Sequence, residues 1–283
     1  QTWGSNKLGL LSVSKIHPAD ITALAADSFL VFAAAGKEVY AWRRGDELQR
    51  VFRGHNAEVH LILPFGPHLI TIDAEGVLKV WEIKTGSEHL EMTFNNEKTR
   101  ISAICHPSTY IDKILVGSSQ GHLQLWNLKS TKLIYTFEGW SSGVSCLQQA
   151  PAIDVVAIGL LNGDIHLHNL KYDKTVVKFH QDWGAVTGLG FRTDDKAVMV
   201  SGSPKGHIAV WDLEERKLES QMRDSHQASI TGLACLPGEP ILVTSSSDNS
   251  VKQWIFDMSD GGGRLLRKRE GHAAPPGRVR YYG

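Results

Sequence analysis

Short runs of alternating hydrophobic and polar residues, separated by turn residues, recur along the whole chain. In the clearest instance, the apolar run 241–244 leads to the pair Asp248-Asn249, and alternation resumes at Val251. Asp and Asn tolerate the positive φ of tight turns, so this pattern predicts a strand, a two-residue turn and a second strand. The sequence shows no amphipathic helical period. The chain is therefore predicted to be all-β.

This unit repeats at a nearly constant spacing of about 40–45 residues, which is the length of one four-stranded propeller blade. Each unit carries one bulky ring, usually of Trp, at the same strand position. Five residues before most of these rings stands a residue suited to positive φ, usually glycine, as at Gly76, Gly121, Gly163 and Gly206. In the first unit, Lys37 takes that place and Gly36 is one residue earlier. The ring positions are Trp42, Trp81, Trp126, His168, Trp211 and Trp254.

These features resemble the WD-repeat β-propellers over the whole chain. Gly54-His55 and Gly271-His272 resemble the Gly-His that precedes a blade in that family, and Trp211-Asp212 matches its Trp-Asp dipeptide. We therefore predict a WD40-type β-propeller with six complete four-stranded blades and parts of a seventh. The parts are residues 1–17 and 278–283, and we expect 1–283 to be a single propeller excised from a longer, two-propeller protein.

Bulk composition excludes several classes of function. The 30 basic and 30 acidic residues balance, so no global charge draws the chain to nucleic acid or membrane. Cys105, Cys146 and Cys235 fall on predicted first strands without Cys-x-x-Cys pairing, which favours reduced core thiols over disulfides or metal. No apolar run is long enough to span a membrane and no signal peptide is visible. We expect a soluble, intracellular protein.

The last complete unit contains residues that resemble a Ser/His/Asp triad. The family resemblance implies instead a structural tetrad of His226, Ser246, Asp248 and Trp254, with Thr244 as the alternative hydroxyl. No strained nucleophile turn or oxyanion loop accompanies these residues. We therefore predict no catalytic residue, no cofactor and no metal.

The fourth unit departs from the pattern, because His168 stands where a Trp is expected and Trp140 stands where the His is expected. The two rings have either exchanged places in the core or left Trp140 exposed as a partner contact. Trp183, at the same offset in the next unit, would then be a second contact, since indoles are frequent interface anchors. His166 and His168 share a strand face, but no third metal ligand accompanies them.

A run of six basic residues near the end of the chain is its strongest concentration of charge. A basic run can contact RNA phosphates or an acidic partner, or it can be a solvated basic strand. No stacking aromatic is interleaved before Tyr281, so sequence-specific reading of single-stranded RNA is not supported. The residues are Arg264, Arg267, Lys268, Arg269, Arg278 and Arg280.

Several segments outside the generic repeat positions are similar to one family, the tandem-propeller WD-repeat subunit of the UTP-B complex of the small-subunit processome. They include HPSTYIDKILVGSSQGHLQLWN (106–127), QQAPAIDVVAIGL (148–160) and GSPKGHIAVWDLE (202–214). The resemblance covers nearly the whole chain, as the first propeller of that protein.

This resemblance implies a non-enzymatic interaction scaffold in small ribosomal subunit biogenesis and pre-rRNA processing, located in the nucleolus. Its partners would be other protein subunits, with contact to the backbone of pre-rRNA or small nucleolar RNA, and with neither a membrane nor a small-molecule substrate. The alternative is a generic WD-propeller adaptor or peptide receptor unrelated to ribosome assembly, because a propeller alone does not fix function.

Overall fold

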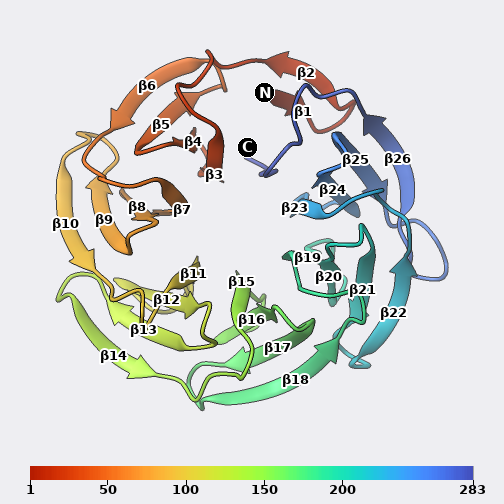
Figure 1. Cartoon of the computed structure of the whole chain (residues 1–283). Coiled ribbons are helices and arrows are strands. Elements are labelled where there is room, and N and C mark those ends of the chain that lie inside the picture. The colour runs from red at the N-terminus through yellow and green to blue at the C-terminus, as the bar shows by residue number, and fades with distance from the viewer. Residues whose placement is uncertain (283) are drawn as a thin grey trace. The chain divides into compact units, whose positions relative to one another are not determined.

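The computed structural model describes residues 1–282, and within them every regular element is a strand. Six four-stranded antiparallel sheets and one two-stranded sheet follow one another along the chain, and the strands of each sheet pair in chain order (Figure 1). These are the blades of a WD40-type β-propeller, as predicted. The described chain divides into two compact units, one of residues 1–101 with 280–282 and one of residues 102–279.

The first unit holds the two-stranded sheet and blades one and two. Its strands are β1 (Thr2–Gly4), β2 (Gly9–Ser12), β3 (Ile21–Ala26), β4 (Leu30–Ala35), β5 (Glu38–Arg43), β6 (Glu47–Phe52), β7 (Val59–Phe65), β8 (His68–Asp73), β9 (Val77–Glu82) and β10 (Glu88–Thr93).

The second unit holds blades three to six, with β11 starting at its boundary. Its strands are β11 (Ile101–Cys105), β12 (Lys113–Ser118), β13 (Leu123–Asn127), β14 (Lys132–Thr136), β15 (Val144–Gln149), β16 (Val155–Leu160), β17 (Asp164–Asn169), β18 (Lys174–His180), β19 (Gly188–Phe191), β20 (Val198–Gly202), β21 (Ile208–Asp212), β22 (Lys217–Met222), β23 (Ile230–Cys235), β24 (Ile241–Ser246), β25 (Ser250–Ile255) and β26 (Arg264–Arg269).

The core of each unit forms where neighbouring blades face one another. Second and third strands carry apolar residues on both faces, as in β16, where all six residues are buried. Fourth strands are paired on one side only and alternate exposed with half-buried positions, as in β22. One apolar cluster joins Leu115 and Phe137 of blade three to Val144 and Ile158 of blade four. Burial of these faces supplies the main driving force for the fold.

The turn between the second and third strands of blade six differs from the prediction. Ser246 pairs with Ser250, so three residues form the turn rather than two, with Asn249 at φ +62. A left-handed third residue is the usual solution for such a loop. In blade one Ala35 pairs with Glu38, which leaves a two-residue turn that begins with Gly36 at φ +59.

The turn between the second and third strands of blade three requires glycine for two reasons, its positive φ and the close approach of another segment of backbone. Gly121 has φ +91, and a Cβ atom there would lie 2.1 Å from the carbonyl oxygen of Trp140. That close approach lets the Trp140 amide donate to the Gly121 carbonyl at 2.9 Å. Gly206 is in the same situation, since its Cβ would lie 2.2 Å from the His226 carbonyl oxygen.

A recurrent hydrogen bond connects successive blades within each unit. The second residue of a first strand donates its hydroxyl to the carbonyl of the residue that opens the next blade, as Ser145 does to Val186 at 2.7 Å. Thr231 makes the same bond to Pro276 at 2.6 Å. Residues 276–279 therefore lie beside β23 in the place of a next first strand.

The two predicted parts of a seventh blade have different outcomes. Residues 1–17 do contain paired strands, β1 and β2, with Trp3 opposite Leu10. The predicted strand over 278–282 is wrong, because no regular strand forms there in the described residues, and residue 283 lies outside them.

Candidate functional site

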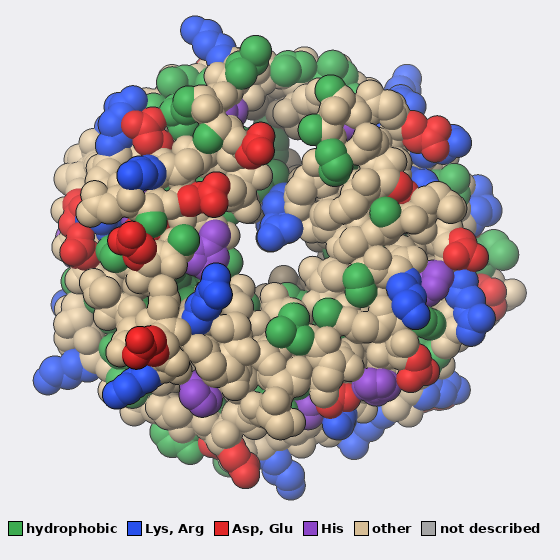
Figure 2. All heavy atoms as spheres, in the orientation of Figure 1, with side chains coloured by type: hydrophobic (Ala, Val, Ile, Leu, Met, Phe, Trp, Pro, Cys, Tyr) green, Lys and Arg blue, Asp and Glu red, His purple; other side chains and the backbone are tan. Residues whose placement is uncertain are grey.

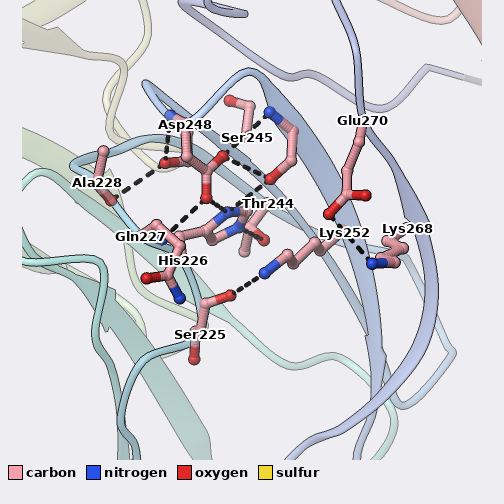
Figure 3. Close-up of polar contacts among 12 residues, drawn as sticks. Ser225, His226, Gln227, Ala228, Thr244, Ser245, Asp248, Lys252, Lys268 and Glu270 are labelled. Carbon is pink, nitrogen blue, oxygen red and sulfur yellow. Dashed lines mark hydrogen bonds and ion pairs between the residues drawn. The ribbon is translucent and has the colours of Figure 1, made fainter.

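The side chains that resemble a catalytic triad form a buried chain of hydrogen bonds in blade six (Figure 3). His226 places Nδ1 3.0 Å from Asp248 Oδ2 and Nε2 2.7 Å from Thr244 Oγ1. Trp254 donates its indole N–H to the same Thr244 oxygen at 2.9 Å. A neutral imidazole with its proton on Nδ1 satisfies every member of this chain. No hydroxyl in it is left free to act as a nucleophile.

The hydroxyl of this tetrad belongs to Thr244 and not to Ser246. Ser246 donates to the carbonyl of Ala228 and accepts from the amide of Asp248, both at 3.1 Å. It therefore holds the turn in shape rather than joining the imidazole to the indole. The assignment of Ser246 from sequence was wrong because both residues point into the interior and only the register decides which reaches His226.

The carboxylate of Asp248 is held ionised by its neighbours. Burial alone would raise its pKa, but donation from the Ser250 hydroxyl, the Gln227 amide and His226 lowers it to about 2. The Gln227 amide lies 2.9 Å from Oδ2 and the Ser250 amide 3.0 Å from Oδ1. Burial lowers the pKa of His226, which the adjacent carboxylate opposes only in part. The pair is thus a fixed carboxylate beside a neutral imidazole.

Blade two contains a second complete tetrad, which the reasoning from sequence missed. His55 lies 2.8 Å from Asp73 and 2.6 Å from Thr71, and Trp81 donates to Thr71 at 2.8 Å. The His-to-Asp separation is 18 residues here and 22 in blade six, which hid the match. The hydroxyl-to-Trp separation of 10 is the same in both and was the signal available.

Blade five replaces the histidine by glutamine. Ser201 donates to Gln181 Oε1 at 2.8 Å and accepts the indole N–H of Trp211 at 2.9 Å. The Gln181 amide nitrogen donates to the carbonyls of Gly184, Ala185 and Gly202, so no aspartate is needed. The three networks therefore recur as a structural feature. In each of them a buried hydroxyl accepts the indole N–H of the Trp, and the third member is histidine in two blades and glutamine in the other.

In blade four the exchanged rings pack against each other. Trp140 is half-buried in the apolar cluster of blades three and four, with its ring centroid 5.4 Å from His168 and 5.2 Å from His166. His168 is also bonded to Asp173 at 3.0 Å. Burial lowers the pKa of His166 to about 4, so this imidazole is neutral at ordinary pH. The geometry favours core packing, and a partner contact through Trp140 stays a prediction.

Trp183 is also half-buried and lies edge-on to His207, with ring centroids 5.3 Å apart. It packs against the apolar cluster of blades four and five. Trp140 and Trp183 thus contribute to two separate clusters, so the structure does not bring them together as one anchor pair.

Several members of the basic run are engaged within the fold. Arg264 pairs with Asp257, and Lys268 with Glu270 at 3.2 Å. Arg267 donates to Gln253 at 3.2 Å, and Arg278 donates to the carbonyl of Thr231 at 3.3 Å. Arg269 is exposed at the end of β26, and Arg280 is exposed beyond it. A phosphate contact through these residues stays a prediction.

The three cysteines lie on β11, β15 and β23, which are first strands as predicted, and all are free thiols. Burial raises the pKa of each thiol to about 12, so none is a nucleophile near neutral pH. Within residues 1–282, no group of three or more His, Cys, Asp or Glu side chains is placed to hold a metal ion. The same residues contain no helix long and apolar enough to cross a membrane.

Comparison with known proteins identifies the family. Residues 1–257 match the family model described as the WDR36/Utp21 first β-propeller. The chain belongs to the WDR36/Utp21 family. Its match is to the first propeller of that family, which agrees with the resemblance in the segments 106–127 and 202–214.

Curated relatives from three organisms match this WDR36/Utp21 chain along nearly its whole length. WD repeat-containing protein 36 of Homo sapiens is 53% identical over 100% of this chain. U3 small nucleolar RNA-associated protein 21 homolog of Schizosaccharomyces pombe is 38% identical over 100% of the chain. U3 small nucleolar RNA-associated protein 21 of Saccharomyces cerevisiae is 28% identical over 99% of the chain. The chain spans about a third of the length of each relative, 32% in all three.

Solved structures show the same fold at low sequence identity. The WD40 repeats of RRP9 and the structure of U3-55K both align with a TM-score of 0.83 and 17% identity, covering 96% of this chain. They cover 86% and 88% of those chains. This likeness supports the WD40 propeller and carries no statement about function.

Proposed function

We propose that this WDR36/Utp21 propeller is a non-enzymatic protein-interaction scaffold in small ribosomal subunit biogenesis. It would act in pre-rRNA processing, within a small nucleolar ribonucleoprotein assembly of the nucleolus. The observation that carries the proposal is family membership along the chain, with relatives named U3 small nucleolar RNA-associated protein 21.

The internal chemistry of the blades supports a non-enzymatic role. The His, Asp and hydroxyl groups that could carry acid–base chemistry already form hydrogen bonds within the blades. The two threonine hydroxyls accept from Trp81 and Trp254, and Asp248 accepts from turn backbone. A rigid array of short strands presents loops for binding instead of a reaction centre. Its partners would be other protein subunits of the assembly, with contact to the backbone of pre-rRNA or small nucleolar RNA.

Purification of the tagged chain from cells tests this function directly. We expect U3 small nucleolar RNA, precursor ribosomal RNA and proteins of the same assembly to be enriched over a purification of an unrelated WD40 propeller. Recovery of a clean, stoichiometric partner set that lacks these RNAs and proteins would instead assign the chain to a generic adaptor.

A second experiment tests direct RNA contact by the basic strand. A triple variant, Arg267→Glu with Lys268→Glu and Arg269→Glu, should lower RNA recovery most at low salt. The remaining recovery should depend less on salt, because binding that makes fewer phosphate contacts releases fewer counterions from the RNA. The control is Lys217→Glu with Arg223→Glu, which reverses exposed charges in blade five. Equal recovery from both variants over a range of salt would remove the basic strand from the proposed function.

A further inference from the structure

The loop between β25 and β26 is the longest connection between a third and a fourth strand in the described chain. It comprises eight residues, 256–263, whereas the corresponding loops of the other five blades have three to five. The loop extends outward at the right of Figure 1, and acidic and hydrophobic side chains stand out at the same edge in Figure 2. All four residues from Asp257 to Asp260 are exposed. Exposed loops of small and polar residues are the preferred places for a protease to bind backbone.

The loop carries a sequence that occurs once in the chain. Asp257 and Asp260 are the only two aspartates three positions apart, and Asp260-Gly261 is the only Asp-Gly bond. Cysteine proteases of the caspase type cut after aspartate, and they favour a second aspartate three residues earlier and a small residue directly after the cut. Their cleft pairs arginine side chains with both carboxylates, which is a strong and geometrically specific contact. The segment DMSDG (257–261) has each of these features.

The backbone after Asp260 can take the extended form that a protease cleft requires. Gly261 has φ +73 and is followed by Gly262 and Gly263. Glycine passes between this conformation and an extended one at little cost. The loop also borders a cavity of about 370 Å³, which it shares with β22 and which is lined in part by Met258 and Asp260. A segment with few packed neighbours opens locally more readily than the strands on either side of it.

The bonds that hold the two aspartates are local and exposed. Arg264 pairs with Asp257, and the two side chains are 52% and 40% exposed. Asp260 accepts the amide of Gly262 at 2.9 Å within the same loop. An exposed ion pair contributes little to stability, and an arginine of the protease would replace Arg264 as the partner of Asp257. Neither bond therefore keeps the segment out of a cleft.

We propose that the peptide bond between Asp260 and Gly261 is a cleavage site for an aspartate-specific cysteine protease. The protease thiolate would attack the Asp260 carbonyl carbon, and the Gly261 nitrogen would leave as an amine with a proton from the protease histidine. Water would then hydrolyse the thioester. The products are a chain that ends in the backbone carboxylate of Asp260 and a fragment that begins at Gly261. This site is independent of the proposed scaffold role.

The cut would separate β26 and the basic run from the rest of blade six. β26 is hydrogen-bonded to β25 alone among the described strands, and none of its six residues is buried. After the cut, the fragment would be held by this strand pairing and by bonds such as that from Thr231 to Pro276. Contacts that no longer share a covalent chain lose their high effective concentration. We therefore expect the fragment to dissociate on dilution.

Digestion of the purified chain with an executioner caspase tests the proposal. The chain should be cut once, and N-terminal sequencing of the small fragment should begin at Gly261. Asp260→Ala should abolish cleavage. Asp257→Ala should slow it at least about tenfold, because one arginine pocket of the protease is then left without a carboxylate. Size-exclusion chromatography should separate the small fragment from the large one.

Asp224→Ala is the matched control, because Asp224 is 84% exposed and precedes the small Ser225 but has Gln221 three positions earlier. This variant should be cut at the wild-type rate. Cleavage at another aspartate, no cleavage, or equal rates for Asp257→Ala and the wild type would overturn the proposal.

Subtilisin, which needs no aspartate, separates recognition by the protease from misfolding of a variant. It should cut the 256–263 loop of the wild type and of Asp260→Ala alike, so that loss of caspase cleavage in the variant reports recognition. A wild-type loop that resists subtilisin would contradict the accessibility on which the site depends. Co-elution of the two caspase fragments would show that the cut does not remove the basic run.

Discussion

Thr244 and Trp254 meet across the second and third strands of blade six, where the threonine oxygen accepts the indole N–H at 2.9 Å. The same oxygen lies 2.7 Å from His226 Nε2, so one hydroxyl satisfies two buried groups. A buried polar group without a partner costs more than the bond itself contributes. The small hydroxyl is therefore more important to blade six than its size suggests.

Replacement of this hydroxyl should be costly. Thr244→Val keeps the shape but leaves the indole N–H and the imidazole nitrogen unpaired, which should lower the free energy of unfolding by about 2–4 kcal/mol. Urea denaturation measures the change. Thr93→Val, at an exposed position of β10, is the control and should change stability by no more than about 0.5 kcal/mol. Equal effects of the two substitutions would refute the role assigned to Thr244.

The turn glycine of blade three should be irreplaceable. Gly121→Ala forces a Cβ to within 2.1 Å of a backbone oxygen at φ +91, so we expect a loss of more than about 3 kcal/mol or failure to fold. Gly66→Ala is the matched control, because Gly66 has φ +54 with nothing within 4 Å of the added atom. That change should cost about 1 kcal/mol. Thermal melting of both variants provides the comparison.

Acidification should destabilise the chain in two steps. Burial lowers the pKa of His55, His166 and His226, so the unfolded chain binds more protons than the folded chain as pH falls below about 6.5. Stability is therefore greatest above that pH and declines beneath it. Stability should fall further below about pH 4. The pKa of Asp248 is about 2 in the folded chain and higher in the unfolded chain, so in this range the unfolded chain binds the proton more readily.

The His226→Gln variant isolates one part of this pH dependence. Glutamine does not titrate, and Gln181 already fills the equivalent position in blade five. The difference in unfolding free energy between about pH 7 and about pH 5 should be smaller in the variant than in the wild type. A wild-type chain as stable at the lower pH as at the higher one would contradict the expected loss of stability on histidine protonation.

Trp140 should contribute to stability, because its ring packs between His166 and the apolar cluster of blades three and four. Trp140→Ala should cost about 2 kcal/mol, less than for a fully buried indole, and Trp140→Phe about 1 kcal/mol. Tyr172→Ala is the control for an exposed aromatic of blade four and should have little effect. A melting temperature unchanged by Trp140→Ala would instead favour a side chain available to partners.

Much of the architecture was predictable from local pattern. The alternation in each unit, the spacing of Trp81, Trp126, Trp211 and Trp254 and the glycine before most of these rings define the strands and their turns, because these preferences act over a few residues. The pairing register of the strands is harder to predict from local pattern. The Ser246–Ser250 pair, which gives three turn residues instead of two, and the choice of Thr244 over Ser246 depend on how β24 and β25 align.

The sequence by itself determined the repeat, the strand count of each blade and the family, since all three are written in residue types at short and regular spacing. Tertiary structure decided which polar side chains meet, because His55 and Asp73 or Gln181 and Ser201 come together only when strands and connecting loops fold onto each other. It also decided which apolar residues stay outside. Ile111 and Ile153 are large apolar residues, and the packing of blades three and four leaves them 78% and 74% exposed.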